Sequence, residues 1–193
     1  YFDTIEIQTI LSLLKIIDNP MQDIPLVSVL RSNIGKFNDN ELINIKLNGK
    51  NEKNEYFYNT FESALENDKT PSYLKEKMQK FLENIELWRK QNEYMPLHEL
   101  IWKIYLDTGY YQYVGLMPNG TLRQANLKML FDRAREYEKA SFKGLFHFIN
   151  YINSLRRANN DMDSAKVIGE NEDVVRIMSI HKSKGLEFPV VIL

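Results

Sequence analysis

The chain has 193 residues, of which 44% are hydrophobic and 26% are charged, and it contains no cysteine. This composition predicts a folded globular protein with a buried core, and it excludes disulfide-stapled folds and thiolate metal sites. The mean hydropathy of -0.42 and the net charge of -1 argue against a membrane span and against a globally basic nucleic-acid-binding protein, so any DNA contact must come from a local patch.

Helical periodicity covers most of the chain. Apolar residues recur at intervals of three and four positions, and helix-breaking or capping residues separate the runs. In chain order, the pattern predicts helices over residues 4–17, 23–31, a stretch that begins near Asn38, 56–66, 71–88, 96–108, 121–139 and 143–157. The last of these is apolar on several sides, so we expect it to be buried in the bundle.

Local signals mark several helix ends. Asp3 followed by Glu6 resembles a capping box, and so does Asn38 followed by Glu41. Gly109 stands where the end of a helix favours glycine. Together with the periodicity, these signals predict that the bulk of the chain is all-α.

The period changes only near the C-terminus. Residues 174–179 and 189–193 are β-branched runs short enough to be strands, and the polar, acidic residues 161–172 form the expected linker before them. Because the chain lacks an initial methionine and stops within the apolar residues 190–193, we expect it to be a fragment of a longer protein.

The loop between the two predicted strands carries the chemistry. It holds two hydroxyls, an imidazole, two ammonium groups, a glycine and a carboxylate, supplied by Ser179, Ser183, His181, Lys182, Lys184, Gly185 and Glu187. Loops after buried strands often hold binding sites, and these groups suit a phosphodiester backbone on one side and a sugar hydroxyl on the other. The alternative is a solvated loop whose lysines contact nothing.

This loop resembles a known motif. Residues 179–188, with the sequence SIHKSKGLEF, are similar to motif V of the UvrD-like superfamily 1 helicases. That family usually has threonine where Ser179 stands, and serine keeps the hydroxyl that can bond a phosphate.

Further stretches extend the resemblance over most of the chain. Residues 1–20 and 29–32 resemble the segment called motif IVa. Residues 123–127, 131–138 and 141–146 resemble one branch in particular, the A subunits of the AddAB-type ATP-dependent helicase/nucleases, which process double-strand breaks in bacteria.

The resemblance implies a fold and a division of the chain. It predicts a mainly α protein in which a helical bundle, the 2B-like insertion, is flanked by pieces of a RecA-like α/β domain, 2A, with one or two short strands at the C-terminus. Residues 1–33 would form the first piece of 2A as a helical hairpin, residues 34–164 the insertion, and residues 165–193 the return to 2A with motif V.

The resemblance also implies roles for the motif V residues. Ser179, His181 and Lys182 would contact the phosphate backbone of single-stranded DNA. Gly185 and Glu187 would bind ATP, with Glu187 accepting a hydrogen bond from the ribose. Backbone contacts suit translocation without sequence preference, and a carboxylate suits a hydroxyl donor.

The parent protein that the resemblance implies is an ATP-dependent DNA helicase with exonuclease activity, acting in recombinational repair. It would work in the bacterial cytoplasm with no membrane partner, use ATP and Mg²⁺, bind single- and double-stranded DNA, and pair with a B subunit. The chain carries no P-loop, no adjacent Asp-Glu pair to hold Mg²⁺ and no nuclease set. We therefore expect the isolated chain to be inactive and to contain no metal site.

Two alternatives remain for the parent: a UvrD/PcrA-type repair helicase without a nuclease, and a non-enzymatic helical interaction module with an idle motif V loop. Residues 121–157 are locally basic and could face duplex DNA, but a solvated helix face with internal ion pairs is an equal alternative. Trp88, Trp102 and Tyr110-Tyr111 could stack on bases, although aromatic residues at helical spacing more often belong to a core.

Overall fold

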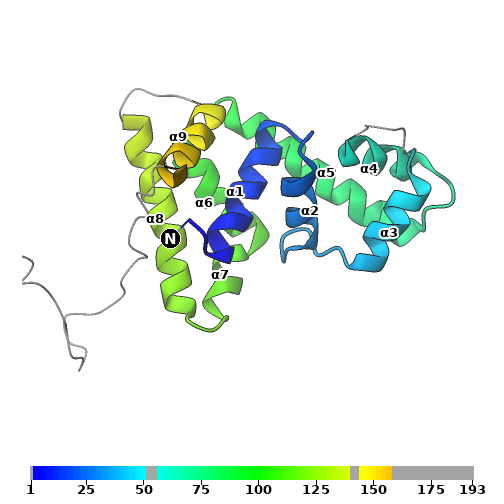
Figure 1. The fold of residues 1–193 in the computed structure, drawn as a ribbon, viewed down its shortest axis with the longest axis horizontal. Helices are drawn as coiled ribbons and strands as arrows, with labels where there is room; N and C mark the ends of the chain where they lie inside the picture. The colour runs from blue at the N-terminus through cyan, green and yellow to red at the C-terminus, as the bar shows by residue number, and fades with distance from the viewer. Residues whose placement is uncertain (1, 51–55, 140–143, 158–193) are drawn as a thin grey trace, which may run out of the picture.

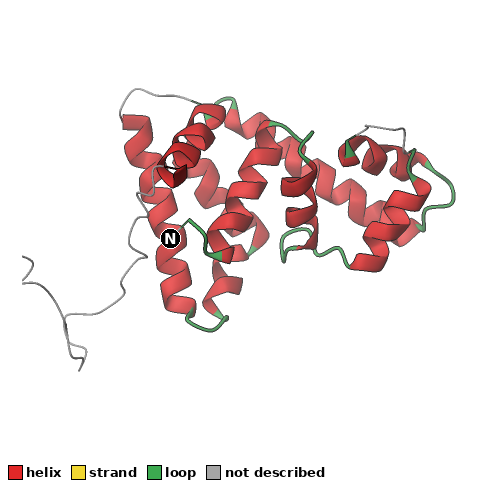
Figure 2. Ribbon diagram, in the orientation of Figure 1, coloured by secondary structure: helices red, strands yellow, loops and turns green. Residues whose placement is uncertain are grey.

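The computed structural model describes residues 2–50, 56–139 and 144–157. Every regular element in these ranges is a helix, as Figure 2 shows, which confirms the prediction of a mainly α fold. The helices are α1 (Ile5–Asp18), α2 (Asp23–Arg31), α3 (Asp39–Asn48), α4 (Phe57–Glu66), α5 (Ser72–Asn92), α6 (Leu97–Thr108), α7 (Tyr110–Gly115), α8 (Gly120–Lys139) and α9 (Leu145–Arg157). The linker and the strands predicted within residues 161–193 lie outside the described residues.

Local sequence signals account for two of the described helix ends. The capping box of α3 forms, with the Asn38 side chain accepting from the Glu41 amide and the Glu41 carboxylate accepting from the Asn38 amide, each at 2.9 Å. Gly109 ends α6 with a φ of 64°, a left-handed conformation that a Cβ atom disfavours. The periodicity does not predict α7, because six residues are too few to show a helical period.

Helix α1 lies at the centre of the molecule. It packs against α2, α5, α8 and α9. In Figure 1 it lies between α3 and α4 at one end and the group α6 to α9 at the other. Its fully buried apolar side chains include Ile7, Ile10, Leu13 and Leu14. Since each such side chain contributes about 1.5–3 kcal/mol when it is buried, α1 is a main source of core stability.

Helix α9 is buried on one face only. Leu145, Phe148 and Ile152 lie in the core, and the Phe148 ring meets the Tyr137 ring of α8 at a centroid distance of 5.5 Å. Phe146, in contrast, is 56% exposed. The expectation of a fully buried helix is therefore correct for the face toward α1 and α8 and wrong for the opposite face.

The predicted domain division stays a prediction. Helix α1, which the division assigns to 2A, shares a core with α8 and α9, which it assigns to the helical insertion. Whatever the boundary between the domains, residues 5–18 and the helices of residues 120–157 are in direct contact. A displacement of α1 must therefore be accommodated by α8 and α9.

Candidate functional site

The residues predicted to bind DNA and ATP lie outside the described part of the chain. These residues are Ser179, His181, Lys182, Gly185 and Glu187. Their contacts with phosphate and ribose therefore stay predictions. The described helices contain the segment that resembles motif IVa, the first two stretches that resemble the A subunits of helicase/nucleases, and a groove on the outer face of α6.

A buried polar cluster joins α1 to α8. Glu6, in the first turn of α1, is 1% exposed. One of its carboxylate oxygens accepts from Arg123 Nη1 at 2.6 Å, and the other accepts from Asn126 Nδ2 at 2.7 Å. The cluster thus brings together two stretches that resemble the helicase family, residues 1–20 and residues 123–127.

Opposing effects set the pKa of Glu6. Burial raises this pKa, but four other influences lower it: the hydrogen bond from Asn126, a bond from the backbone amide of Glu6 itself, a bond from the Thr4 side chain and the charge of Arg123. The net pKa lies below its ordinary value. Glu6 is therefore ionised at neutral pH, the state in which it accepts from both α8 side chains.

The predicted capping role of Glu6 is wrong. Thr4 is the N-cap of α1, and Asp3 instead accepts a hydrogen bond from Arg156 of α9 at 2.5 Å. The sequence does hold a signal for the observed role, because Glu6 lies four positions before Ile10 on a stripe that is otherwise apolar, where an unpaired carboxylate would be costly. Local spacing could not identify its partners, which follow 117 and 120 residues later.

Ion pairs neutralise part of the basic stretch at residues 121–157. Three of its arginines are paired: Arg123 with Glu6, Arg133 with Glu136 at 3.7 Å, and Arg156 with Asp3. Three other cations are exposed on α8: Lys128, Arg135 and Lys139. The side chains of Lys143 and Arg157 lie outside the described residues. Internal ion pairs thus account for Arg123, Arg133 and Arg156. A patch that faces duplex DNA stays a prediction.

The aromatic residues considered for base stacking differ in their surroundings. Trp88 is buried, with its Nε1 donating to Asp107 at 3.0 Å, and Tyr110 is buried as well. Trp102 and Tyr111 are half-buried, and their ring centroids lie 5.5 Å apart. The core interpretation is confirmed for Trp88 and Tyr110, whereas Trp102 keeps an accessible edge.

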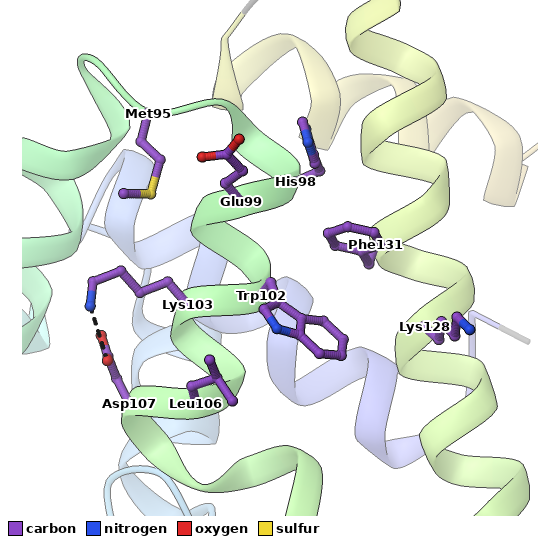
Figure 3. A pocket seen from close by; sticks show the side chains of 9 residues that line it. All are labelled: Met95, His98, Glu99, Trp102, Lys103, Leu106, Asp107, Lys128 and Phe131. Atoms are coloured by element: carbon purple, nitrogen blue, oxygen red, sulfur yellow. Dashed lines mark hydrogen bonds and ion pairs between the residues drawn. The ribbon is translucent and has the colours of Figure 1, made fainter.

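The outer face of α6 and the adjoining side of α8 form a groove of about 610 Å³ (Figure 3). Its aromatic floor consists of Trp102 from α6 and Phe131 from α8, with ring centroids 5.5 Å apart. Leu106 adds an apolar side chain that is 55% exposed. Lys103 and Asp107 line the same face and form an ion pair at 3.1 Å, drawn as a dashed line in Figure 3.

Glu138 of α8 caps the N-terminus of α6 beside this groove. Its Oε1 accepts from the Leu97 amide at 2.6 Å, its Oε2 accepts from the His98 amide at 3.4 Å, and the His98 Nδ1 bonds the same carboxylate. The first amides of a helix need such acceptors, and Pro96 at the N-cap has no side-chain acceptor to offer. A carboxylate from a neighbouring helix therefore supplies the cap and ties α6 to α8.

Replacing Glu138 by alanine should lower the free energy of unfolding by about 1–2 kcal/mol, because the change removes the cap and the partner of His98 together. Urea denaturation followed by circular dichroism measures the change. The matched control is Glu136→Ala on the same helix, whose side chain is 68% exposed and whose pair with Arg133 is long, so its effect should stay within about 0.5 kcal/mol. Equal effects of the two variants would show that Glu138 is not a cap in solution.

Two kinds of feature are absent from the described ranges. Within residues 2–50, 56–139 and 144–157, no cluster of three or more His, Asp or Glu side chains could hold a metal ion. The helices of the same ranges include none with both the length and the apolar character required to cross a membrane.

Comparison with known proteins gives a consistent result over the full chain. The family of UvrD-like helicase C-terminal domains matches residues 1–193. The chain is 55% identical over 195 residues to the A subunit of the ATP-dependent helicase/nuclease of Clostridium novyi (strain NT), an alignment that covers 100% of this chain and 16% of that protein. It is 56% identical over 199 residues to the protein of the same name from Clostridium beijerinckii, with 100% and 16% covered. It is 55% identical over 193 residues to that of Thermoanaerobacter pseudethanolicus, with 100% and 15% covered. The chain thus spans 15–16% of the length of these relatives.

Proposed function

Because the chain belongs to the family of UvrD-like helicase C-terminal domains, we propose that it is part of the A subunit of an ATP-dependent DNA helicase/nuclease. The observation that carries this proposal is the identity of 55–56% over the whole chain to relatives of that name from several bacteria. The all-helical structure of residues 5–157, where regular elements are described, supports it, since the motif IVa resemblance and the 2B-like insertion both require helices there.

The parent protein would unwind and process DNA ends for recombinational repair of double-strand breaks. Its partners would be single- and double-stranded DNA and a B subunit, it would use ATP with Mg²⁺, and it would work in the bacterial cytoplasm. The Mg²⁺ ligands, the P-loop and the exonuclease centre would lie in other parts of the polypeptide.

Within the parent, the chain would couple nucleotide binding to DNA contacts. Ser179, His181 and Lys182 would hold the phosphate backbone of single-stranded DNA, and Gly185 and Glu187 would hold ATP. The buried bonds from Arg123 and Asn126 to Glu6 support a mechanical role for α1, because they fix it to α8. Helices packed in this way move together.

The experiment that tests this proposal uses the full-length polypeptide, purified with its partner subunit, and a blunt-ended linear duplex. With ATP and Mg²⁺ we expect unwinding together with degradation of the DNA. The isolated 193-residue chain serves as the control and should show no ATPase activity above background. Unwinding without degradation would favour the UvrD/PcrA-type helicase, and the absence of both activities would favour the helical interaction module.

A further inference from the structure

The groove on α6 has no covering segment within the described part of the chain, although its floor is formed by aromatic and apolar side chains. We propose that it receives an amphipathic helix from another part of the same full-length polypeptide, an inference that rests on the proposed function. The groove has a volume of about 610 Å³ and runs along the outer face of α6 beside α8 (Figure 3).

The floor of the groove is rigid and aromatic. The Trp102 ring is held among three others, with centroids 5.5 Å from Tyr111, 5.5 Å from Phe131 and 6.0 Å from Tyr105. Leu106 is 55% exposed beside it. A tryptophan fixed by its neighbours in a partly covered depression is the kind of residue that dominates binding between protein surfaces, because little side-chain entropy is lost on contact.

The charges of the groove favour a protein segment over nucleic acid. The other charged groups that line it are paired within the described residues, which leaves Glu99 and Lys128 without an ion pair. Figure 3 shows these two side chains on different helices, toward opposite sides of the groove. One carboxylate and one ammonium give no excess of positive charge, which phosphate binding requires. A helix with an apolar stripe, a basic residue near Glu99 and an acidic residue near Lys128 complements both.

The length of the relatives favours the same polypeptide as the source of the docked helix. This chain covers 16% of the Clostridium novyi relative, so most of such a polypeptide lies outside residues 1–193. Permanent interfaces between subunits typically bury over about 2,000 Å², whereas modest and partly charged contacts are typical between domains of one chain.

The labelling rate of an introduced cysteine tests this inference. The chain has no cysteine, so the Leu106→Cys variant of the 193-residue chain carries a single thiol in the groove. The same substitution is made in the full-length polypeptide, and peptide mapping follows its reaction with a maleimide. We expect labelling to be at least about tenfold slower in the full-length polypeptide, because docking must open before the thiol reacts. Lys128→Cys, on the α8 side, is the second probe if Leu106→Cys fails to fold.

Charge reversal supplies the matched control. Glu99→Lys in the full-length Leu106→Cys background should restore rapid labelling, since it places a cation beside the basic residue of the docked helix. Glu76→Lys, an exposed position on α5 outside the groove, should leave the slow labelling unchanged. If Glu99→Lys failed to restore rapid labelling, the inference that a helix with a basic residue near Glu99 occupies the groove would be overturned.

The remaining outcomes separate the possible occupants. Equal labelling in the short chain and the full-length polypeptide would overturn the inference. Protection that appears only when a single-stranded oligonucleotide, the partner subunit or a high concentration of the protein is added would overturn it too, and would assign the groove to that occupant. Unwinding and degradation are measured on the same preparation, so a failure of the proposed function is distinguishable from a failure of this inference.

Discussion

Replacing Arg123 by methionine should lower the free energy of unfolding by about 1.5–3 kcal/mol, the range for a hydrogen bond to a charged group, since Arg123 is itself 24% exposed. The Glu6 carboxylate, 1% exposed, would keep its bond from Asn126 but lose the cation that balances its charge. Methionine preserves most of the aliphatic stem, so the loss reports the charge and not the packing. Urea denaturation of the 193-residue chain gives the value.

Two further variants decide whether the buried pair is the cause. Arg133→Met, on the same helix, removes a pair with Glu136 that is 3.7 Å long and largely exposed, and should change stability by less than about 1 kcal/mol. The double variant Glu6→Leu with Arg123→Met should recover much of the loss, because no charge remains buried without a partner. An effect of Arg123→Met no larger than that of Arg133→Met would show that α8 does not hold Glu6 in solution.

The same cluster should make stability depend on pH in the acid range. The folded pKa of Glu6 lies below its ordinary value of 4.5, so its contribution is fully present above pH 4.5 and is lost as the pH falls through the folded pKa. The pKa of Glu41 is lowered as well: burial raises it, but the bond and charge of Lys77 and the Asn38 amide outweigh that effect. Glu6→Gln should therefore weaken the pH dependence of the free energy of unfolding below pH 4.5. The part of that dependence that is due to Glu41 should remain.

Local chemistry explains which parts of the fold could be predicted. The start of α2 follows from Pro20 before it and Pro25 in its first turn, and the start of α3 follows from the capping box of Asn38. Each of these signals acts within four residues. The short helix α7 escapes detection, because its six residues follow the Gly109 signal and carry no period of their own.

The functional features also differ in whether nearby residues in the sequence could reveal them. The role of Glu6 depends on Arg123 and Asn126, and the cap of α6 depends on Glu138, which lies 41 residues after Leu97. Local spacing relates only residues that are neighbours along one helix, so the position of Glu6 three residues after Asp3 predicts a capping box instead. The predicted motif V loop shows the reverse, because a run of ten residues predicts it by resemblance alone, and it stays a prediction since it lies outside the described residues.

Replacing Glu187 by alanine in the full-length protein should raise the ATP concentration needed for half-maximal unwinding by roughly ten- to a hundredfold, since a hydrogen bond to a charged acceptor contributes about 1.5–3 kcal/mol. The maximal rate should change much less, because the proposed ribose bond would be present in bound ATP both before and during hydrolysis. Unwinding rates over a range of ATP concentrations measure both quantities. An unchanged ATP dependence would exclude the ribose contact.

The matched control lies six positions earlier in the same loop. His181→Ala should weaken binding to single-stranded DNA while leaving the ATP dependence unchanged, the opposite result to that of Glu187→Ala. If His181 contacts a phosphate as a cation, the slope of log affinity against log salt should also flatten by about 0.7. If either variant impaired both ATP dependence and DNA affinity, the loop would act as one folded unit, because two independent contacts would each lose only their own ligand.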